Sequence, residues 1–491
     1  MKKREKKKAS MGLKIAARFL WILTLAATVF FGYELYKLNM IPLNYYLIGM
    51  GVLFFIVFII GVFALRKKAG RTSLSIISFI SVIIIAVLGF GSLKIKDTVS
   101  FMEKNLGIKF ETNVYYVLVN ADSEYEKIKD IKGETVYTYK DLDDMEPVEK
   151  ALTKKVKVEF EYAKSVYEML NNLTSDKKLI VYVNSGNYDF MTQNNDEYSK
   201  KVKILETIEI KTKKEVEKTE LDVTEDPFVI LINGIDTRSN SLPSRSLSDV
   251  NMLMAVNPKT HEILLLSVPR DYYLTIPNTG GAKDKLTHTG TIGGVETTIA
   301  TLEETFGIDI SYFVRVNFNF VTNLVDAVGG IDIDNDQPYT FTCWTDSGCT
   351  FYPGVNYGVG GRCALAFARE RYAYETGDRH RVQNQQQVLN NLFNKITSSK
   401  TLISSYSDIL NSLNGTFETN LSNDDLSKLV KMQINEMPGW TIYQYAVTGY
   451  GMSAYTYSYP NQELYVMVPD DETIAEAIGR LKYILEIESD E

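Results

Sequence analysis

Three uncharged apolar stretches near the N-terminus constrain this chain more than any other feature. They comprise residues 19–33, 41–65 and 72–93. About 20 apolar residues cross a bilayer as a helix, so the second and third stretches are long enough alone. The first suffices when the flanking Lys14, Arg18 and Lys37 extend their charged ends to the membrane interfaces. We therefore expect three transmembrane helices, at about 13–38, 41–65 and 72–93.

Basic residues beside these stretches predict the orientation of the chain. Six Lys and Arg lie in residues 2–8 and four in residues 66–71, whereas the loop 39–44 has no charge. Because basic flanks stay in the cytoplasm, residues 1–96 form a multi-pass anchor of the cell membrane with a cytoplasmic N-terminus, and residues 97–491 lie outside. A cleaved signal peptide at 1–35 is the alternative. No small-residue cleavage site follows it, and two more spans do.

The charge is distributed unevenly between these two parts. Residues 1–96 carry a net charge of +13 and residues 97–491 a net charge of −21. The basic tail at 2–8 could suggest a nucleic-acid partner. It is explained more simply as a topology signal or a contact to anionic lipid, so we expect a membrane partner and no nucleic acid.

The part beyond the membrane contains two modules of different composition. Residues 97–224 hold 20 Lys and no Arg, with apolar runs at 114–119 and 179–183 that are typical of buried strands. They predict a small α/β accessory domain. In residues 225–491, strand-like runs alternate with helical periodicity, which predicts a second, layered α/β domain. Its expected strands include 228–232, 250–256, 262–268 and 312–316, and its expected helices 295–306, 318–328 and 385–396.

Arginine is concentrated in the second module. Residues 225–385 contain only three Lys but nine Arg, at positions 238, 245, 270, 315, 362, 369, 371, 379 and 381. The planar guanidinium donates bidentate hydrogen bonds to phosphate oxygens, so the cluster indicates a phosphate or pyrophosphate ligand. Scattered surface ion pairs are the alternative. Residues 364–371 are predicted as a strand with Arg369 and Arg371 on one face. A helix that starts near Arg379 would place Arg381 and Gln385 on one face.

Three aspartates stand at predicted strand ends, namely Asp236, Asp249 and Asp271. Ligands of α/β sheets gather beyond strand ends, and carboxylates suit a hard cation such as Mg²⁺. Taken singly, each aspartate is more simply explained as a turn former or a helix cap. With only three histidines in the chain, a Zn²⁺ site is disfavoured.

The three cysteines, Cys343, Cys349 and Cys363, are all expected outside the cell, where disulfides persist. One pair and one leftover thiol are predicted. Sequence alone does not fix the pairing. The loop between Cys349 and Cys363 holds Pro353 and several glycines and can close, which favours that pair.

A set of motifs in order across residues 226–400 resembles the LytR-CpsA-Psr family. They are Asn-Gly-Ile-Asp at 233–236, Ser-Asp-Val-Asn-Met at 248–252, Asn-Pro-Lys-Thr at 257–260, Ser-Val-Pro-Arg-Asp at 267–271, Lys-Leu-Thr-His at 285–288, Val-Asp-Ala-Val-Gly-Gly at 325–330, and the segments 364–371 and 377–387. The three spans and residues 97–224 look like the capsule-associated branch of that family. The resemblance implies a layered α/β/α domain with a mixed central sheet over residues 225–491.

The resemblance also implies roles for individual residues. Asp236 and Asp249 would bind Mg²⁺ or Mn²⁺, and Asp249, Asp271 and Arg270 would be catalytic, with Asp271 or a metal-bound aspartate as the base. The pyrophosphate would be held by Arg238, Arg245, Arg270, Lys285, Arg369, Arg371, Arg381 and Gln385. Two positions depart from the family pattern: Leu247 and Asn384 stand where many members have Arg. Arg245 would then reach the place that Leu247 leaves.

The implied activity is transfer of an anionic glycopolymer, capsular polysaccharide before teichoic acid, from undecaprenyl pyrophosphate to peptidoglycan. Membrane proteins of capsule synthesis are candidate partners. The lipid needs an apolar groove, for which Val314, Val316, Phe318, Phe320 and Leu324 are candidates, with ordinary core packing as the alternative. Two other functions compete with transfer. One is a lipid pyrophosphatase that uses the same site, and the other a non-catalytic membrane regulator of capsule synthesis.

Overall fold

The computed structural model describes residues 9–67, 69–107, 110–140, 145–195, 197–213, 221–235, 242–398, 409, 412–413 and 415–487. The chain forms two compact units. The first comprises Met1–Lys104 with Ile403–Asn411 and Ser422–Pro438, and the second comprises the remaining residues. Each unit is described by itself below.

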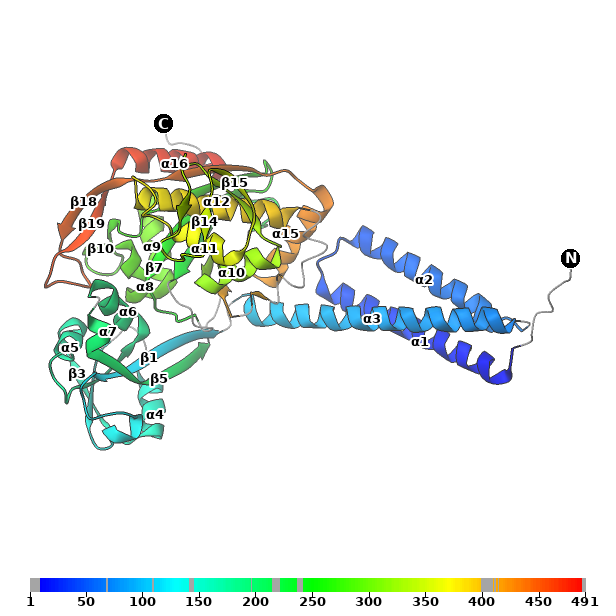
Figure 1. Ribbon diagram of the computed structural model, residues 1–491, viewed down its shortest axis with the longest axis horizontal. Helices are drawn as coiled ribbons and strands as arrows, with labels where there is room; N and C mark the ends of the chain where they lie inside the picture. Colours follow the sequence, from blue (N-terminus) through cyan, green and yellow to red (C-terminus); the bar gives the residue numbers. More distant parts are fainter. Residues whose placement is uncertain are drawn as a thin grey trace. The chain divides into compact units, whose positions relative to one another are not determined.

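The first unit contains three helices that are long and apolar enough to cross a membrane. They are α1 (Met11–Leu38), α2 (Leu43–Leu65) and α3 (Arg71–Asn105), and Figure 1 labels all three. Trp21 of α1 donates from its indole N–H to the carbonyl of Val57 on α2 over 3.1 Å. Tyr46 of α2 donates to the carbonyl of Gly32 on α1 over 3.0 Å. The three predicted spans are therefore present, whereas their orientation stays a prediction.

Helix α3 continues past the predicted end of its span. Its 35 residues correspond to about 50 Å at 1.5 Å per residue, against about 30 Å for a hydrocarbon core. Helix α15 (Asn423–Glu436), far away in the sequence, belongs to the same unit. Its Lys431 donates to the Asn39 side chain, just after α1, over 2.7 Å. A polar C-terminal segment thus returns to the end of the apolar helices.

The second unit begins with a five-stranded sheet in the order β3-β2-β4-β1-β5. Strand β1 (Phe110–Asn120) pairs antiparallel with β4 (Ile180–Asn184) and β5 (Val202–Lys213). Strand β2 (Thr135–Tyr139) pairs in parallel with β3 (Glu159–Ala163) and β4. The connecting helices are α4 (Glu146–Lys155), α5 (Val166–Asn172), α6 (Ser185–Asn194) and α7 (Tyr198–Lys201). This α/β sheet lies within the segment predicted as the accessory domain.

Alternation along β1 gives this sheet two apolar faces. Val117 and Val119 belong to one core cluster, and Leu118 belongs to the other. The second of these clusters also contains Tyr459 and Leu464, from near the C-terminus. The accessory sheet therefore shares a core with a distant part of the same unit.

A six-stranded mixed sheet forms the larger part of the second unit, in the order β16-β11-β6-β7-β8-β17. Strands β6 (Phe228–Ile235), β7 (Ser248–Asn257) and β8 (Glu262–Val268) form an antiparallel meander. Strand β11 (Tyr312–Val316) runs parallel to β6, and β17 (Thr441–Ala446) runs parallel to β8. Strand β16 (Phe417–Thr419) closes the sheet antiparallel to β11.

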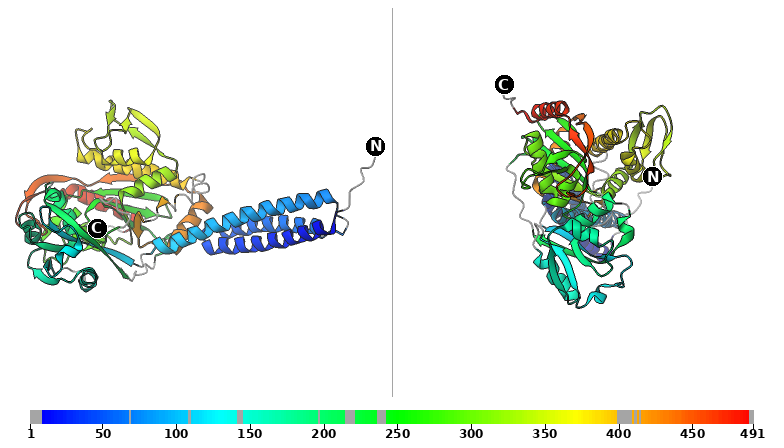
Figure 2. Two further views of the ribbon diagram at one scale, coloured as in Figure 1. Left: turned by 60° about the horizontal axis from the view of Figure 1, so that its bottom comes forward. Right: turned by 90° about the vertical axis from the view of Figure 1, so that its left-hand side faces the viewer.

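Helices cover this sheet on both faces. Val229 and Leu231 of β6 face a core that includes residues of α9 (Gly294–Phe306) and α16 (Asp471–Leu485). The opposite face carries α10 (Phe318–Ala327), α11 (Gly361–Arg369) and α12 (Asp378–Thr397), as Figures 1 and 2 show. The predicted α/β/α layering with a mixed central sheet is therefore confirmed.

One predicted strand is wrong. Residues 364–371 are not a strand, because α11 runs through Arg369 and buries Ala364, Phe367 and Ala368. These buried positions recur at helical spacing, one turn apart. Arg369 is the last residue of the helix, and Arg371 lies beyond it. The two arginines therefore do not share a strand face.

Small hairpins complete the unit. They pair β9 (Tyr273–Thr275) with β10 (Lys283–Lys285), β12 (Ile331–Asn335) with β15 (Gly354–Val359), β13 (Phe341–Thr342) with β14 (Thr350–Phe351), and β18 (Gly449–Ala454) with β19 (Leu464–Pro469). A disulfide joins Cys349 to Cys363, the pair favoured from the sequence. Cys343 is a buried free thiol. Burial raises the pKa of Cys343 to about 12.

Candidate functional site

An apolar pocket lies on the face of the mixed sheet that carries α10, α11 and α12. The sheet contributes the ends of β6, β7 and β11, since alternation turns Ile232 and Met252 away from the core on the other face. Leu365 of α11 and Val388 of α12 close the opposite side. The full lining is Ile232, Gly234, Ile235, Asp249, Val250, Met252, Val316, Asn317, Phe318, Phe320, Val321, Leu365, Ala368, Arg369, Gln385, Val388, Leu389 and Leu392.

Three of the five residues predicted to line an apolar groove lie on this pocket. Val316, Phe318 and Phe320 line the pocket, whereas Val314 and Leu324 are not among its lining residues. The sequence prediction missed the contribution of α12. Its Val388, Leu389 and Leu392 follow Gln385 at helical spacing, a signal that was available in the sequence.

Two long polar side chains and one carboxylate interrupt this apolar lining. They are Arg369, Gln385 and Asp249. The Arg369 guanidinium lies over the ring of Phe318, with its central carbon 4.2 Å from the ring centroid. Within the described residues, neither Arg369 nor Gln385 makes a side-chain hydrogen bond or ion pair. Both therefore have donors available for an anionic group beside an apolar chain.

Asp249 is the first member of a chain of alternating charges. Arg270 Nη1 lies 2.9 Å from Asp249 Oδ1, and Arg270 Nε lies 3.7 Å from Asp271 Oδ2. Lys285 Nζ continues the chain at 3.1 Å from Asp271 Oδ1. The four side chains are 11–24% exposed. All three predicted catalytic residues and Lys285 therefore meet in one half-buried cluster.

Neighbouring elements hold this cluster in place. The Thr287 hydroxyl donates to Asp249 Oδ1 over 3.1 Å, a contact that sequence reasoning missed. Thr287 belongs to α8 (Leu286–Ile292), which follows β10 directly. Its backbone N–H donates to the Arg270 carbonyl over 2.8 Å. The β9–β10 hairpin and α8 thus position both ends of the charge chain.

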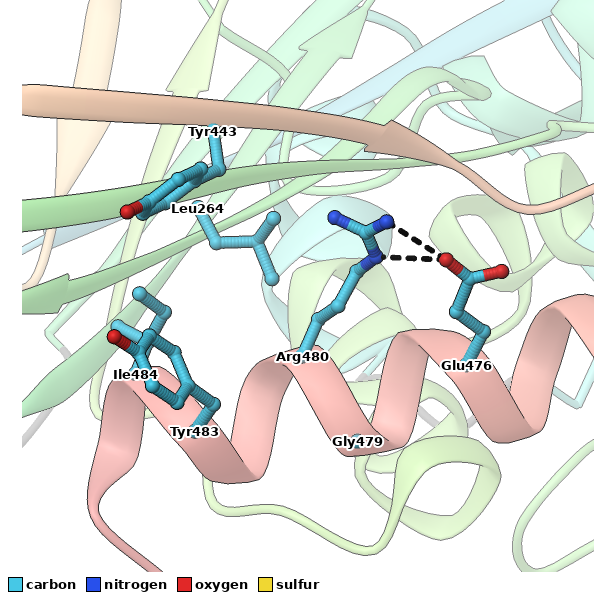
Figure 3. A pocket seen from close by; sticks show the side chains of 7 residues that line it. All are labelled: Leu264, Tyr443, Glu476, Gly479, Arg480, Tyr483 and Ile484. Carbon is cyan, nitrogen blue, oxygen red and sulfur yellow. Dashed lines mark hydrogen bonds and ion pairs between the residues drawn. The ribbon is translucent and has the colours of Figure 1, made fainter.

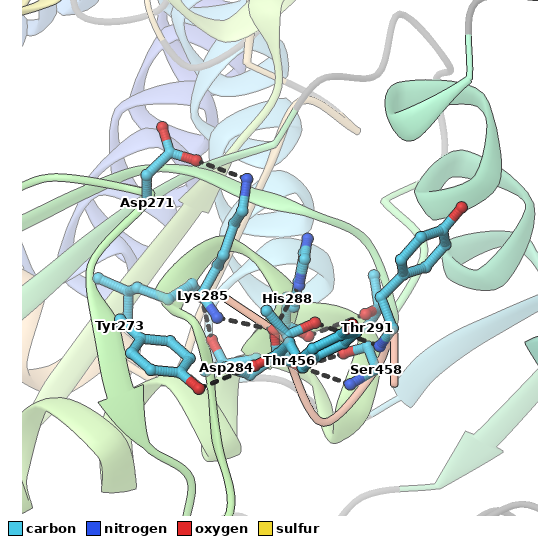
Figure 4. Close-up of polar contacts among 12 residues, drawn as sticks. Asp271, Tyr273, Asp284, Lys285, His288, Thr291, Thr456 and Ser458 are labelled. Atoms are coloured by element: carbon cyan, nitrogen blue, oxygen red, sulfur yellow. Dashed lines mark hydrogen bonds and ion pairs between the residues drawn. The ribbon is translucent and has the colours of Figure 1, made fainter. Parts of the chain in front are cut away.

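A buried polar network anchors Lys285 from below, as Figure 4 shows. Asp284, next to Lys285, is fully buried and accepts from the backbone N–H of Ser458 over 2.7 Å, and its other oxygen lies 2.6 Å from Nδ1 of His288. Burial would raise the pKa of Asp284, but the His288 ring and the hydrogen bonds from His288 and Ser458 outweigh it and lower that pKa. Asp284 stands between Ser458 and His288, so the three do not have the order of a nucleophilic triad.

Arg245 does not lie in the pocket. Its side chain is buried and donates to the backbone carbonyl of Thr291 over 3.2 Å and to that of Ile292. The hydroxyl of Ser185, on α6 of the accessory sheet, donates to the Arg245 carbonyl over 3.4 Å. The structure thus uses Arg245 where the two sheets of the second unit meet.

Arg315, one of the nine clustered arginines, is also structural. Its buried guanidinium pairs with Glu418 over 2.9 Å and donates to the Pro243 carbonyl and the Ser246 hydroxyl. It holds the segment that leads into β7. A dense arginine composition therefore overstates the number of guanidinium groups that are free to bind a ligand.

The remaining predicted residues are distributed around the pocket. Arg371 is exposed, and its guanidinium lies 4.8 Å from the Tyr372 ring centroid. Arg381 lies on α12 one turn before Gln385, as predicted, but it is not among the lining residues. Asp236 and Arg238 lie outside the described residues.

The described residues contain no group of three or more His, Cys, Asp or Glu side chains that could hold a metal ion. Asp249 nevertheless fits a hard cation, because only its Oδ1 is hydrogen-bonded within that part of the chain. Mg²⁺ in phosphate-transfer sites is commonly held by one or two carboxylates together with substrate phosphates. Among the residues that the structure describes, Asp249 is thus the candidate ligand of a divalent cation.

A second hollow, between β17 and α16, lacks free charge. Figure 3 shows its lining of Leu264, Tyr443, Glu476, Gly479, Arg480, Tyr483 and Ile484. Arg480 donates twice to Glu476, over 3.0 and 2.7 Å, and lies over the Tyr445 ring. Its one guanidinium is already paired, so this hollow is a weaker candidate for anion binding.

The comparison with protein families decides the classification. The model of the LytR_cpsA_psr family matches residues 191–471, which is more than half of the 491-residue chain. The chain belongs to the LytR-CpsA-Psr family. The match covers the whole six-stranded sheet, the pocket and the charge chain, and it also includes the last strand of the accessory sheet.

Curated LytR-CpsA-Psr relatives are similar over part of their length. A protein of Enterococcus faecalis named polyisoprenyl-teichoic acid–peptidoglycan teichoic acid transferase TagU is 32% identical over 227 residues, which is 46% of this chain and 71% of the relative. A Bacillus mycoides protein of the same name is 35% identical over 206 residues, which is 42% of this chain and 64% of that relative. Transferase is the enzyme class predicted from the sequence.

Among solved structures, that of protein gbs0355 from Streptococcus agalactiae is 25% identical to this chain. The match covers 54% of this chain and 90% of that one, with a TM-score of 0.46.

Proposed function

We propose that this chain transfers a glycopolymer from a polyprenyl pyrophosphate carrier to peptidoglycan. The observation that carries the proposal is the pocket that combines an apolar lining with the unpaired guanidinium of Arg369 and the carboxylate of Asp249. Such a pocket suits an amphiphilic ligand with an apolar chain and an anionic head. The names of the relatives connect this chemistry with polyisoprenyl-linked polymers and peptidoglycan.

The proposed reaction is a phosphoryl transfer. A sugar hydroxyl of the acceptor glycan attacks the phosphorus that carries the polymer, and the bond from this phosphorus to the bridging oxygen breaks. Polyprenyl phosphate leaves with the electron pair, and the hydroxyl proton passes to a base. Such transfers depend mainly on positioning and on neutralising charge. Arg369 and Arg270 supply fixed positive charge for the leaving phosphate.

We propose Asp271 as the base, since Arg270 joins it to Asp249, which lines the pocket. Lys285 and Arg270 flank it on both sides and orient its oxygens. We also propose that Asp249, with Asp236, holds Mg²⁺ or Mn²⁺. When bound, the cation would offset charge on the diphosphate.

Capsular polysaccharide remains our proposal for the polymer, because the three spans and the accessory domain resemble the capsule-associated branch of the family. The named relatives concern teichoic acid instead. Both are anionic glycopolymers. Analysis of the cell wall distinguishes the two polymers. The polymer that this protein transfers is attached to peptidoglycan in cells that have the gene and is missing from peptidoglycan in cells that lack it.

The decisive experiment compares two arginine variants in the full-length protein. Arg369→Ala removes the pocket guanidinium, and Arg480→Ala removes a guanidinium paired with Glu476 on α16, outside the pocket. We expect transfer from lipid-linked polymer to peptidoglycan to fall by at least about 100-fold in the first variant, the scale of losing a charge-stabilising donor, and to persist in the second. Equal activity in both variants would refute the proposal.

The same assay separates the two competing functions. A lipid pyrophosphatase would release free phosphate without an adduct between polymer and glycan. A non-catalytic regulator would keep its function in Asp249→Ala and Arg371→Ala proteins and lose it when residues 2–8 are removed. A transferase would lose its activity in the Asp249→Ala and Arg371→Ala proteins. It would keep its activity when residues 2–8 are removed.

A further inference from the structure

Two exposed aromatic rings lie together on the outer surface of the larger domain. Trp344 is 73% exposed and Tyr372 is 61% exposed. Their ring centroids are 5.0 Å apart and their planes are inclined by 52°. Large aromatic side chains usually gain stability by burial, so a pair held in water indicates a binding surface. We call Trp344, Tyr372 and the adjoining Arg371 the aromatic platform.

A buried carboxylate holds the platform from below. Glu370 is only 1% exposed. It accepts from the backbone N–H of Trp344 over 2.5 Å with one oxygen. Its other oxygen accepts from the backbone N–H groups of Arg371, Tyr372 and Ala373, over 3.0, 2.7 and 3.1 Å. One side chain thus fixes both segments that present the rings, which reduces the entropy lost when a ligand binds.

Covalent and ionic links fix the segment around Trp344 to helix α11. The Cys349–Cys363 disulfide joins the loop after Trp344 to the first turn of the helix. Arg362, also on that turn, makes two contacts with Asp346, over 3.0 and 2.9 Å. The same helix ends at Arg369 in the lipid pocket. The platform is therefore fixed to α11 twice: the disulfide ties the Trp344 segment to the first turn, and Arg371 and Tyr372 follow the last residue, Arg369.

The platform offers three kinds of contact. The ring faces suit the C–H groups of a pyranose, because the π face of an aromatic ring is electron-rich. The indole N–H of Trp344 makes no hydrogen bond within the described residues. Arg371 lies 4.8 Å from the Tyr372 centroid, and its Nη2 donates to the Tyr372 hydroxyl over 2.7 Å. A sugar next to a phosphate matches this combination.

The sequence separation matches the dimensions of such a ligand. Tyr372 follows Arg369 by three residues, which allows at most about 10 Å between their backbones. A diphosphate held at Arg369 would extend toward Arg371, and the sugar attached to it would then reach the rings. The donor sugar is covalently attached to the diphosphate, whereas an acceptor glycan is not. The short distance between Arg369 and the rings therefore favours the donor as the ligand of the platform.

We propose that Trp344, Tyr372 and Arg371 bind the carrier-proximal sugar of the donor, the one attached directly to the diphosphate. This inference rests on the proposed function and adds a specificity subsite to it. It predicts that the protein distinguishes a sugar-bearing lipid diphosphate from a sugar-free one through these rings.

The test uses the full-length protein in detergent and two probes of equal chain length. One is a polyprenyl diphosphate, and the other is the same lipid diphosphate carrying one N-acetylhexosamine. We expect wild-type protein to prefer the sugar-bearing probe and Trp344→Ala or Tyr372→Ala to bind it about five- to tenfold more weakly, the scale of one aromatic contact. Binding of the sugar-free probe stays unchanged. Trp344→Phe retains most of the preference.

Tyr357→Ala is the matched control, because Tyr357 is 80% exposed on β15, outside the platform. Equal affinity of wild-type protein for both probes would overturn the proposed role of the platform and would leave the proposed transferase function intact. Failure of wild-type protein to bind either probe refutes the proposed function itself. A soluble peptidoglycan fragment that loses affinity in the ring variants would assign the platform to the acceptor and overturn the donor assignment. Loss of self-association in those variants, with unchanged probe binding, would make it an interface between copies.

Discussion

Arg270 Nη1 lies 2.9 Å from Asp249 Oδ1, and Asp249 lines the apolar pocket beside α11 and α12. The pair leaves Asp249 Oδ2 without a hydrogen bond among the described residues. One carboxylate thus fixes an arginine with one oxygen and has the other available for a cation. The arrangement keeps the carboxylate oriented before any substrate arrives, which is how charge stabilisation becomes preorganised.

Asp249→Asn tests the cation role of this carboxylate. The amide retains the size of the side chain but loses the charge that attracts a divalent cation. We expect metal-dependent transfer to fall by about 100-fold or more. Binding of a lipid diphosphate without metal should not weaken, because a negative charge near the phosphates has been removed. Both quantities are measured on the same purified protein, by transfer assay and by calorimetry.

Asp122→Asn is the control, since Asp122 pairs with Lys177 on the surface of the accessory domain. If Asp249→Asn protein weakens metal-free binding as strongly as it weakens transfer, the carboxylate acts by folding the site and not by holding a cation.

Arg270→Lys tests whether geometry or charge matters in the charge chain. Arg270 reaches Asp249 with Nη1 and Asp271 with Nε. Lysine keeps the charge but has one compact ammonium that cannot serve both carboxylates at these positions. We expect the turnover rate to fall by about tenfold or more while folding is retained. Lysine activity equal to that of arginine would show that only the local charge is needed.

Phe318 combines two roles that substitutions can separate. It lines the apolar pocket, and its ring centroid lies 4.2 Å from the central carbon of the Arg369 guanidinium. Phe318→Leu keeps much of the apolar surface and removes the ring, so it should weaken binding of inorganic pyrophosphate and lipid diphosphate alike, by about 0.5–1 kcal/mol. Phe318→Ala should cost an additional 1–2 kcal/mol only for the lipid, about the value of the lost apolar contact. Equal losses for both ligands in both variants would contradict a lipid pocket.

Asp284 links acid stability to the site. The pKa of Asp284 is lowered in the fold despite burial, so its unfolded pKa, about 3.9, is the higher of the two. The stabilisation is therefore complete above about pH 4 and is lost as the pH falls through the folded pKa. Asp284→Asn breaks a buried pair with His288 and should destabilise the domain by about 3–5 kcal/mol at pH 7.

Thermal unfolding of the full-length protein between pH 3 and pH 7 measures this effect. The variant should unfold at lower temperature at pH 7 and lose less stability on acidification than the wild type. Ser123→Ala, at a buried residue in the turn after β1, is a control for general loss of a buried polar group. If the unfolding temperatures of wild type and Asp284→Asn fall equally between pH 7 and pH 3, this carboxylate has no role in acid stability.

The strands that sequence predicted best are those buried on both faces. Residues 262–268 and 312–316 were expected as strands, and β8 and β11 have those bounds. Short runs of mostly apolar residues bounded by turns have few other solutions. The alternating Ala-Leu-Ala-Phe-Ala run at 364–368 was ambiguous, because small residues satisfy a strand period and a helix period together. Burial of Ala364 and Phe367 decided for the helix, and the Phe367 ring packs against Phe341 and Phe351.

The site was predictable in its polar residues and less so in its geometry. Asp249, Arg270, Asp271 and Lys285 come from separate motifs, and the structure joins them in one chain. Arg245 and Arg369 belong to the same arginine-rich segment of the sequence. In the structure, however, the Arg245 guanidinium donates to the backbone carbonyls of Thr291 and Ile292. Which arginine is free depends on long-range packing between the two sheets, and no local pattern encodes that.

The two states of cysteine give a chemical test of the fold. Cys349 and Cys363 form a disulfide, and Cys343 is buried with its pKa raised to about 12 by burial. Because the thiolate is the reactive species, Cys343 should resist alkylation by iodoacetamide at pH 8 in the folded protein. Unfolding without reductant should expose one alkylation site, at Cys343, and unfolding with reductant should expose three. Mass spectrometry of the peptides assigns each site. Rapid alkylation of Cys343 in the native protein would mean that the segment between β13 and β14 opens, and with it the support of Trp344.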